Sequence, residues 1–226
     1  MCIRDSNEKG YTNKEISSLI AKNMDIPSIL KNASMDWDGG YTMAGLIGHG
    51  DAFVLRDPNG IRPAFWYEDD EVLVVTSERP VIQTAFNVKW ENVNELKPGH
   101  ALIVKKDFEL KEVEINSPSN LQKCSFERIY FSRGTDKDIY KERLMLGSLV
   151  TPQVLEAVNF DLKRTVFSFI PNTAEMSYYG MIKATEDYLS GVKKKKIQEL
   201  EQNDPKYQEK LDDILSIRTC LLYTSD

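Results

Sequence analysis

The residue pattern nearest to a binding site lies in the second half of the chain, where an apolar run ends in a short polar loop. Residues 165–170 (TVFSFI) are apolar, β-branched and aromatic, which is typical of a buried parallel strand. Pro171, Asn172 and Thr173 follow, and residues 174–189 have the pattern of a helix. A strand, a loop and a helix in this order predict α/β architecture with a ligand at the carboxyl end of the strand.

The other residue types that do chemistry do not occur at catalytic or metal-ligand spacing. The sequence contains no GxGxxG, P-loop, HExxH or paired CxxC motif. His49 and His100 have no second ligand at helical or hairpin spacing, so we expect both to be structural or surface residues. Acidic residues follow the four lysines at 193–196 at once, which indicates a solvated helix face rather than a polyanion site.

Composition narrows the class of protein. The chain has 226 residues, of which 41% are apolar and 28% charged, so we expect a folded, soluble protein with one large domain or parts of two. No apolar run approaches the ~20 residues of a membrane helix, and a net charge of −6 argues against nucleic acid. Three cysteines spread over the whole length make a disulfide-stapled secreted domain unlikely. If Cys2 and Cys220 come from foreign DNA at the two ends, Cys124 is the only native thiol, which predicts a cytoplasmic protein.

Short strands and tight turns dominate the first half. Helical spacing covers residues 13–32, with a second short turn after Asp25. Asp57, Pro58 and Gly60 form a strong turn signal. The predicted strands are residues 41–47, 52–56, 61–67, 72–76, 101–105 and 108–115, with a short helix at 78–86. This pattern predicts an antiparallel sheet with little helix.

The polar residues 116–120 are predicted to be a linker, after which helices dominate. Residues 126–132 fit either a strand or a short helix. A long helix is predicted at 139–158, which Pro152 would kink or divide. Two solvated helices are expected between 193 and 218, the second with Asp204 as N-cap and Pro205 in its first position.

Five segments, in order along the chain, resemble the glutamine phosphoribosylpyrophosphate amidotransferases, or amidophosphoribosyltransferases. They are GDAFVLRDPNGIRP at 50–63, TSE at 76–78, LKPG at 96–99, CSFERIYFSR at 124–133 and FIPNTA at 169–174. The chain departs from the family at His100 and Asn172, where the family has Glu, and at Ala174, where it has Ser. It also has Gly-Thr-Asp at 134–136 in place of Pro-Asp-Ser.

The resemblance implies a two-domain transferase of purine biosynthesis. Its fold class is α+β followed by α/β. Residues 7–116 would be the C-terminal part of an N-terminal-nucleophile glutaminase sandwich, and residues 117–219 the start of a type I phosphoribosyltransferase domain. The full-length enzyme transfers glutamine-derived ammonia to phosphoribosyl pyrophosphate, giving phosphoribosylamine, glutamate and pyrophosphate. It is expected to be a homo-oligomer that acts on small molecules and binds neither nucleic acid nor membrane.

The resemblance also implies roles for single residues. The loop Pro171, Asn172, Thr173 and Ala174 would contact pyrophosphate or phosphate through backbone N–H groups and a hydroxyl before a helix. The alternative is a loop that only caps the helix. Tyr130 and Arg133 match family residues near the ammonia path and the interdomain seam, with simple packing as the alternative for both. We expect turn and packing roles for the three charged residues of the RDPNGIRP string, Arg56, Asp57 and Arg62, with an interdomain role as the alternative.

The catalytic groups of the family have no counterpart in this chain. The glutaminase nucleophile is an N-terminal Cys, and Cys2 lacks its context, so this polypeptide is expected to be inactive. The adjacent acids at 212 and 213 lack the family's following Arg-Gly-Thr-Thr. Mg²⁺ would be held mainly by substrate oxygens, so no protein metal site is expected. Cys124 matches an iron–sulfur ligand of some members, but one thiolate cannot hold a cluster, so an inert cysteine is favoured.

The two ends of the chain can be encoded by nearly the same DNA read in opposite directions. Residues 1–6 can be encoded by ATGTGTATAAGAGACAGC, and the reverse complement of one coding of residues 220–225 contains most of that string. It resembles a transposon-end adapter used in sequencing libraries. We therefore expect residues 1–6 and 220–226 to be translated adapter, and the rest to be an internal fragment.

Two other functions fit the sequence. One is another glutamine amidotransferase, such as the hexosamine-forming synthase, although the strings at 124–133 and 170–174 speak against it. The other is a non-catalytic regulatory protein on the same scaffold, with the lysine-rich residues 192–218 as its partner-binding part. An isolated fragment should also expose apolar faces and be poorly soluble.

Overall fold

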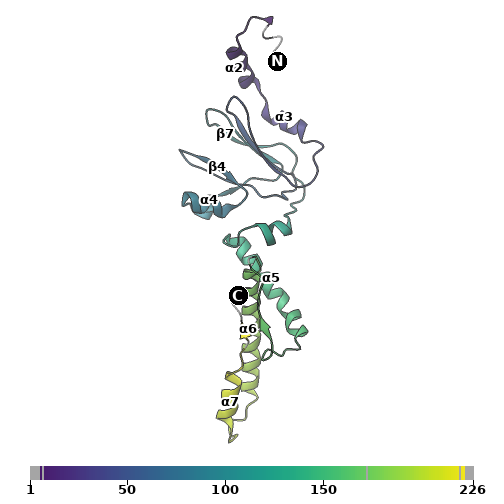
Figure 1. The fold of residues 1–226 in the computed structure, drawn as a ribbon, viewed down its shortest axis with the longest axis vertical. Helices are drawn as coiled ribbons and strands as arrows, with labels where there is room; N and C mark the ends of the chain where they lie inside the picture. Colours follow the sequence, from purple (N-terminus) through teal and green to yellow (C-terminus); the bar gives the residue numbers. More distant parts are fainter. Residues whose placement is uncertain (1–5, 7, 172, 219, 222–226) are drawn as a thin grey trace. The chain divides into compact units, whose positions relative to one another are not determined.

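The computed structural model describes residues 6, 8–171, 173–218 and 220–221. It divides into two compact units, Met1–Arg128 (unit 1) and Ile129–Asp226 (unit 2). Unit 1 contains the β-rich part of the chain and unit 2 the helical part (Figure 1). The sequence therefore predicted the change of secondary structure, although it placed the linker at 116–120, before the boundary between the units.

Unit 1 is built on a four-stranded antiparallel sheet in the order β1-β2-β6-β7. Its strands are β1 (Thr42–Leu46), β2 (Ala52–Arg56), β6 (His100–Val104) and β7 (Leu110–Glu114). Side chains alternate between its faces because successive strand residues point in opposite directions. Leu55, Ala101 and Ile103 are buried on one face and Leu102 on the other.

A helix covers the first of these faces and a second sheet covers the other. Two helices, α2 (Asn13–Asn23) and α3 (Ile26–Ala33), precede the sheet. Asp25, which precedes the second short turn expected from the sequence, caps α3 by accepting a hydrogen bond from the Ser28 amide at 3.2 Å. Ile26 and Leu30 of α3 pack with Leu55 and Ala101.

The second sheet has three antiparallel strands in the order β4-β3-β5. They are β3 (Phe65–Glu68), β4 (Leu73–Thr76) and β5 (Asn94–Glu95), with α4 (Arg79–Phe86) and the 3-10 helix η1 (Trp90–Asn92) between the last two. Ala64, Leu96 and Leu102 form the buried centre between the two sheets, with Trp66 and Val75 packed against them. The predicted antiparallel strands of the first half are confirmed.

Unit 2 is organised around two long helices that pack closely together. They are α5 (Lys137–Ala157) and α6 (Glu175–Gln198). A Cβ atom on Gly147 of α5 would lie 1.8 Å from the Ser177 carbonyl oxygen, and one on Gly180 of α6 would lie 2.0 Å from the Leu144 oxygen. The two glycines therefore allow the helix backbones to touch. Thr151 and Thr185 are also buried in this interface or beside it.

The rest of unit 2 consists of short elements. A π-helical turn, η2 (Glu127–Phe131), runs across the boundary between the units, where the sequence left strand and helix open. The helix α7 (Tyr207–Leu215) follows α6. A two-stranded parallel pair joins β8 (Val166–Phe167) to β9 (Cys220–Leu221), so two residues of the segment expected to be adapter pair in the fold. The other residues of the two expected adapter segments lie outside the described part, except Ser6.

Three predictions about unit 2 are wrong in detail: the strand at 165–170, the separate lysine-rich helix and the N-cap at Asp204. The run at 165–170 forms a strand of only two residues, and Val166 and Ile170 are exposed because the described part of unit 2 provides no larger sheet to cover them. Pro152, which was expected to kink or divide the helix, lies inside α5 without dividing it. The lysines at 193–196 continue α6 instead of forming a helix of their own. Asp204 accepts from the Lys206 amide at 2.8 Å, and α7 begins only at Tyr207, two residues beyond Pro205.

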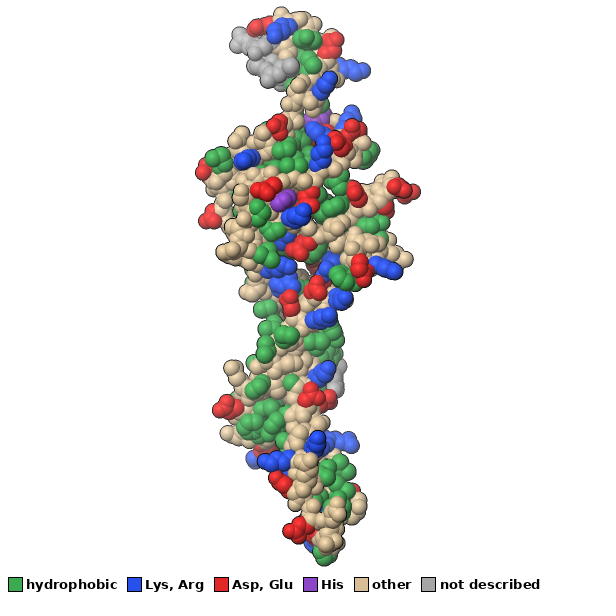
Figure 2. Space-filling model, turned by 180° about the vertical axis from the view of Figure 1, so that it is seen from behind, with side chains coloured by type: hydrophobic (Ala, Val, Ile, Leu, Met, Phe, Trp, Pro, Cys, Tyr) green, Lys and Arg blue, Asp and Glu red, His purple; other side chains and the backbone are tan. Residues whose placement is uncertain are grey.

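One face of α5 carries apolar side chains that unit 2 leaves exposed. Met145 and Leu149 are 63% and 68% exposed, and Leu146 and Val150 lie beside them on the helix. Hydrophobic side chains are visible at the surface of unit 2 (Figure 2). Within the described residues, no helix is both long and apolar enough to span a membrane.

Candidate functional site

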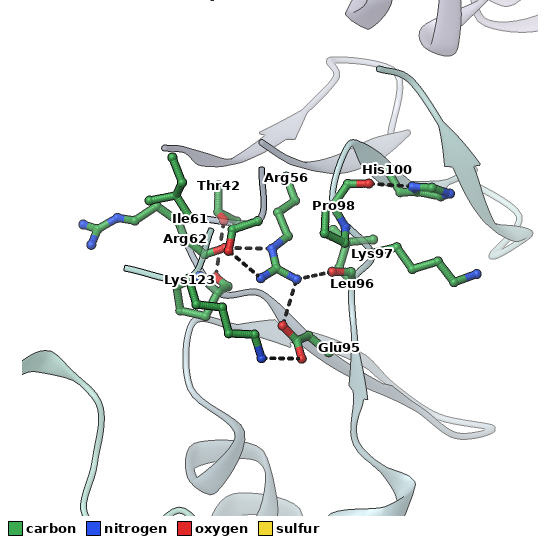
Figure 3. A network of polar contacts seen from close by, with 12 residues as sticks. Thr42, Arg56, Ile61, Arg62, Glu95, Leu96, Lys97, Pro98, His100 and Lys123 are labelled. Atoms are coloured by element: carbon green, nitrogen blue, oxygen red, sulfur yellow. Dashed lines mark hydrogen bonds and ion pairs between the residues drawn. The ribbon is translucent and has the colours of Figure 1, made fainter. Parts of the chain in front are cut away.

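The RDPNGIRP string of unit 1 forms a turn held by the buried side chain of Arg56. Its guanidinium donates to three carbonyl oxygens, those of Arg62 (2.7 Å), Gly60 (3.1 Å) and Leu96. It also pairs with Glu95 at 3.0 Å. These contacts converge on Arg56, which lies between the turn and the end of β5 at Glu95 and the adjacent Leu96 (Figure 3). Arg56 is 1% exposed, so its guanidinium depends on these acceptors rather than on water for its hydrogen bonds.

Asp57 fixes the inside of the same turn. Its Oδ1 accepts from the amides of Asn59 (3.1 Å) and Ile61 (2.9 Å), and its Oδ2 accepts from the Arg62 amide at 3.1 Å. Burial, followed by the nearby Asp57 carboxylate, raises the pKa of Tyr41. Arg56 and Asp57 are therefore structural residues, as the sequence predicted, because their polar groups are used within the turn.

Arg62 points away from this network. Its Nη1 pairs with the carboxylate of Glu127, in the CSFERIYFSR string. Two of the strings that carried the resemblance therefore meet in unit 1.

His49 and His100 have structural surroundings. His49 Nε2 lies 3.1 Å from Asp51 Oδ2, and His100 Nδ1 lies 2.9 Å from the Pro98 carbonyl oxygen. Asp51 is buried, which by itself disfavours its charge. Hydrogen bonds from Lys105, His49 and the Lys106 amide outweigh burial and lower the pKa of Asp51 to about 2. Asp51 thus ties the β1–β2 turn to the β6–β7 turn.

A pocket of about 900 Å³ in unit 2 brings together residues from both segments that the sequence singled out there. Tyr130 and Arg133 come from the first segment, and Thr173 from the loop before α6. The first turns of α5 and α6 complete the wall. The other lining residues are Phe131, Ser132, Gly134, Thr135, Lys137, Tyr140, Lys141, Arg143, Glu175 and Met176.

The lining of this pocket is strongly basic. Arg133, Lys137, Lys141 and Arg143 face a single acidic residue, Glu175, whose Oε1 accepts from Tyr179 at 2.9 Å. Ala174 precedes α6 and makes no side-chain cap. The amides of the first helical turn are therefore not capped by that residue, and the helix dipole adds positive potential. Such a pocket suits a small anion.

Some of the predicted site residues line the pocket and others do not. Tyr130, Arg133 and Thr173 are together in the pocket, whereas Pro171 and Ala174 are not among its lining residues. Asn172 lies outside the described residues. Cys124 is a free cysteine whose Sγ accepts from the Glu127 amide at 3.4 Å. Within the described part of the chain, no three His, Cys, Asp or Glu residues are grouped as metal ligands.

Sequence reasoning missed Arg143. This side chain is 4% exposed and donates to the Ser132 carbonyl oxygen at 2.6 Å, which holds the Tyr130 segment against α5. The signal was a charged residue in the helical series 139, 143, 147, 151 and 155, whose other members are apolar or small. A charged side chain on the buried face of a helix must be hydrogen-bonded to polar groups inside the fold.

We compared the sequence with protein-family models and with curated proteins of known name. No family model matches the chain. A relative from Lachancea kluyveri is 31% identical over 163 residues, which is 67% of this chain and 31% of the relative. Relatives from Pasteurella multocida and Saccharomyces cerevisiae are 33% and 32% identical over 54% and 52% of the chain and 25% of each relative. All three relatives are amidophosphoribosyltransferases. The chain resembles them, and it spans only a quarter to a third of their length.

Two solved structures are similar in fold over most of this chain. The glutamine phosphoribosylpyrophosphate amidotransferase of B. subtilis, complexed with ADP and GMP, covers 96% of this chain with a TM-score of 0.55 and 20% identity. This chain covers 48% of it. A structure described as the allosteric regulatory enzyme of purine biosynthesis covers 80% of the chain with a TM-score of 0.54 and 22% identity, and 39% of its own length is covered.

Proposed function

We propose that the protein is part of an amidophosphoribosyltransferase, which transfers ammonia from glutamine to phosphoribosyl pyrophosphate and forms phosphoribosylamine, glutamate and pyrophosphate. The proposal assigns residues 7–116 to the glutaminase domain and 117–219 to the phosphoribosyltransferase domain. The observation that carries it is the basic pocket, which gathers Tyr130, Arg133 and Thr173 from two separate family-like strings. The names of the relatives favour this activity over the hexosamine-forming synthase.

In this proposal, the pocket binds the pyrophosphate group of the substrate. Four basic side chains supply charge, and the Thr173 hydroxyl and the amides at the start of α6 supply directional donors. Mg²⁺ would accompany phosphoribosyl pyrophosphate on the substrate's own oxygens. Tyr130 and Arg133, at the start of unit 2, would have a second role near the ammonia path.

Calorimetric titration of the 226-residue chain with inorganic pyrophosphate tests the pocket. We expect binding that weakens as the salt concentration rises. Arg133→Ala and Lys141→Ala should each weaken it by about 1.5–3 kcal/mol, the contribution of a hydrogen bond to a charged group. Lys163→Ala is the matched control, because Lys163 is exposed and does not line the pocket. Absence of binding, or equal loss in all three variants, would contradict the pyrophosphate site.

The reaction itself is tested on the product of the complete reading frame. We expect glutamine-dependent release of pyrophosphate from phosphoribosyl pyrophosphate, and we expect the 226-residue chain alone to release none. Release that does not depend on glutamine would contradict the assignment.

A further inference from the structure

The polar segment after β7 is bound along the RDPNGIRP turn. We call residues 117–127 the linker segment. The Ser119 amide donates to the Pro58 carbonyl oxygen at 3.0 Å, and the Gln122 amide donates to the Asn59 oxygen at 2.8 Å. The Cys124 amide donates to the Ile61 oxygen at 3.5 Å. Three main-chain hydrogen bonds therefore hold the linker segment along the turn.

Side chains strengthen this attachment at both ends and in the middle. Ser119 Oγ donates to Asn59 Oδ1 at the start, and Glu127 pairs with Arg62 at the end. Between them, Lys123 Nζ lies 3.6 Å from Glu95 Oε2, on the carboxylate that also pairs with buried Arg56 (Figure 3).

Gly60 gives the linker segment room to lie against the turn. Its φ is +62°, and a Cβ atom there would lie 2.8 Å from Leu121 Cδ1 and 2.9 Å from Pro98 Cγ. A side chain at position 60 would therefore be strained by the backbone and would also meet Leu121.

The turn is held by buried hydrogen bonds, whereas the linker segment is held by partly exposed contacts. Arg56 and Asp57 are buried and fully engaged, so the turn is a rigid surface. Leu121 and Phe126 are 57% and 59% exposed, so the linker segment adds little buried apolar area. A segment held by a few partly exposed hydrogen bonds and ion pairs opens far more often than the core.

We propose that the linker segment is a releasable strap that sets the length of free chain between the two units. When it is docked, the chain is fixed to unit 1 as far as Glu127, which pairs with Arg62. When it is released, the last anchor is Asn116, whose amide donates to the Gly99 oxygen at 3.0 Å and whose Nδ2 donates to Ser34 at 2.9 Å. The freed residues could extend the connection by up to about 40 Å, at ~3.3–3.6 Å per residue.

Hydrogen–deuterium exchange in peptides that cover residues 117–127 of the 226-residue chain measures how often the linker segment is open. Arg62→Ala should speed their exchange about fivefold, the effect of losing one ion pair near the surface. The charge exchange Arg62→Glu with Glu127→Arg should return the rate to near that of the original protein. Gln122→Pro, at an exposed position, removes one main-chain donor and should speed exchange in the same peptides.

Lys111→Ala is the matched control, since Lys111 pairs with Glu109 at 2.7 Å on an exposed edge and should leave these peptides unchanged. Peptides from β2 and β6 should not respond to any variant. The proposal is overturned if residues 117–127 exchange at the rate of an unstructured peptide in the original protein. It is equally overturned if Arg62→Ala and Gln122→Pro leave their exchange unchanged, or speed β2 and β6 to the same extent.

Discussion

Replacing Arg56 with alanine should destabilise unit 1 more than any single change at its surface. The guanidinium is the donor for three carbonyl oxygens, those of Arg62, Gly60 and Leu96, and the side chain is almost fully buried. Alanine would leave these acceptors without a donor and would open a cavity beside the turn.

The size of the effect follows from these contacts. A buried acceptor that loses its donor raises the free energy of the folded state by about 1–3 kcal/mol. Glu95 is 37% exposed and can be hydrated when its partner is lost, so the broken ion pair adds little. Water can also reach part of the turn, so we expect a total loss of about 3–5 kcal/mol. Arg56→Lys keeps the charge but cannot reach all three oxygens, and should lose about 2 kcal/mol.

Urea unfolding followed by tryptophan fluorescence measures this loss. All three tryptophans, Trp37, Trp66 and Trp90, lie in unit 1, so the signal reports that unit. Lys97→Ala is the control, because the Lys97 side chain is 68% exposed, and it should change stability by less than about 0.5 kcal/mol. If Arg56→Ala unfolds within about 1 kcal/mol of the original protein, the network does not hold the turn as argued.

Two further predictions concern the hairpin turns and the helix pair. The pKa of Asp51 is lowered from 3.8 to about 2, so its carboxylate stabilises unit 1 above pH 4, and that stability is lost as the pH falls towards 2. Asp51→Asn should lose up to about 2 kcal/mol at neutral pH and show a shallower acid transition in the same urea assay. Gly147→Ala would place a Cβ atom 1.8 Å from the Ser177 oxygen, so the free energy of unfolding should fall by about 3 kcal/mol or more. Urea unfolding followed by far-UV circular dichroism measures this change. Gly191→Ala, on α6, would place a Cβ atom that meets nothing within 4 Å beyond its own stretch of helix, so it should be neutral or stabilise by up to about 1 kcal/mol. Equal effects of the two glycine changes would refute the tight helix contact.

Local sequence was sufficient for most elements of unit 1. The strand at 52–56 was predicted to the residue, and the hairpin of β6 and β7 and the helix α4 follow closely. Alternation of apolar residues and the turn signal at Asp57–Gly60 depend on neighbours in the chain, which is why they could be read without a fold.

Prediction was weaker in unit 2, where the surroundings decide what a segment becomes. The apolar run at 165–170 has the composition of a buried strand, yet only Val166 and Phe167 pair, because the described part of unit 2 supplies no sheet for the rest. The lysines at 193–196 extended α6 because charged residues are compatible with the interior of a helix whose face is solvated.

The family resemblance, the turn built by Arg56 and Asp57 and the strands of the first half could all be predicted from the order of the residues. The shared basic pocket of Tyr130, Arg133 and Thr173, the support that Arg143 gives it and the position of the linker segment on the RDPNGIRP turn became known only from the folded chain. The reason is physical: helix and strand patterns are set by interactions between near neighbours. The pocket instead depends on the close contact of α5 and α6. Two glycines permit this contact, and no pattern of neighbouring residues predicts it.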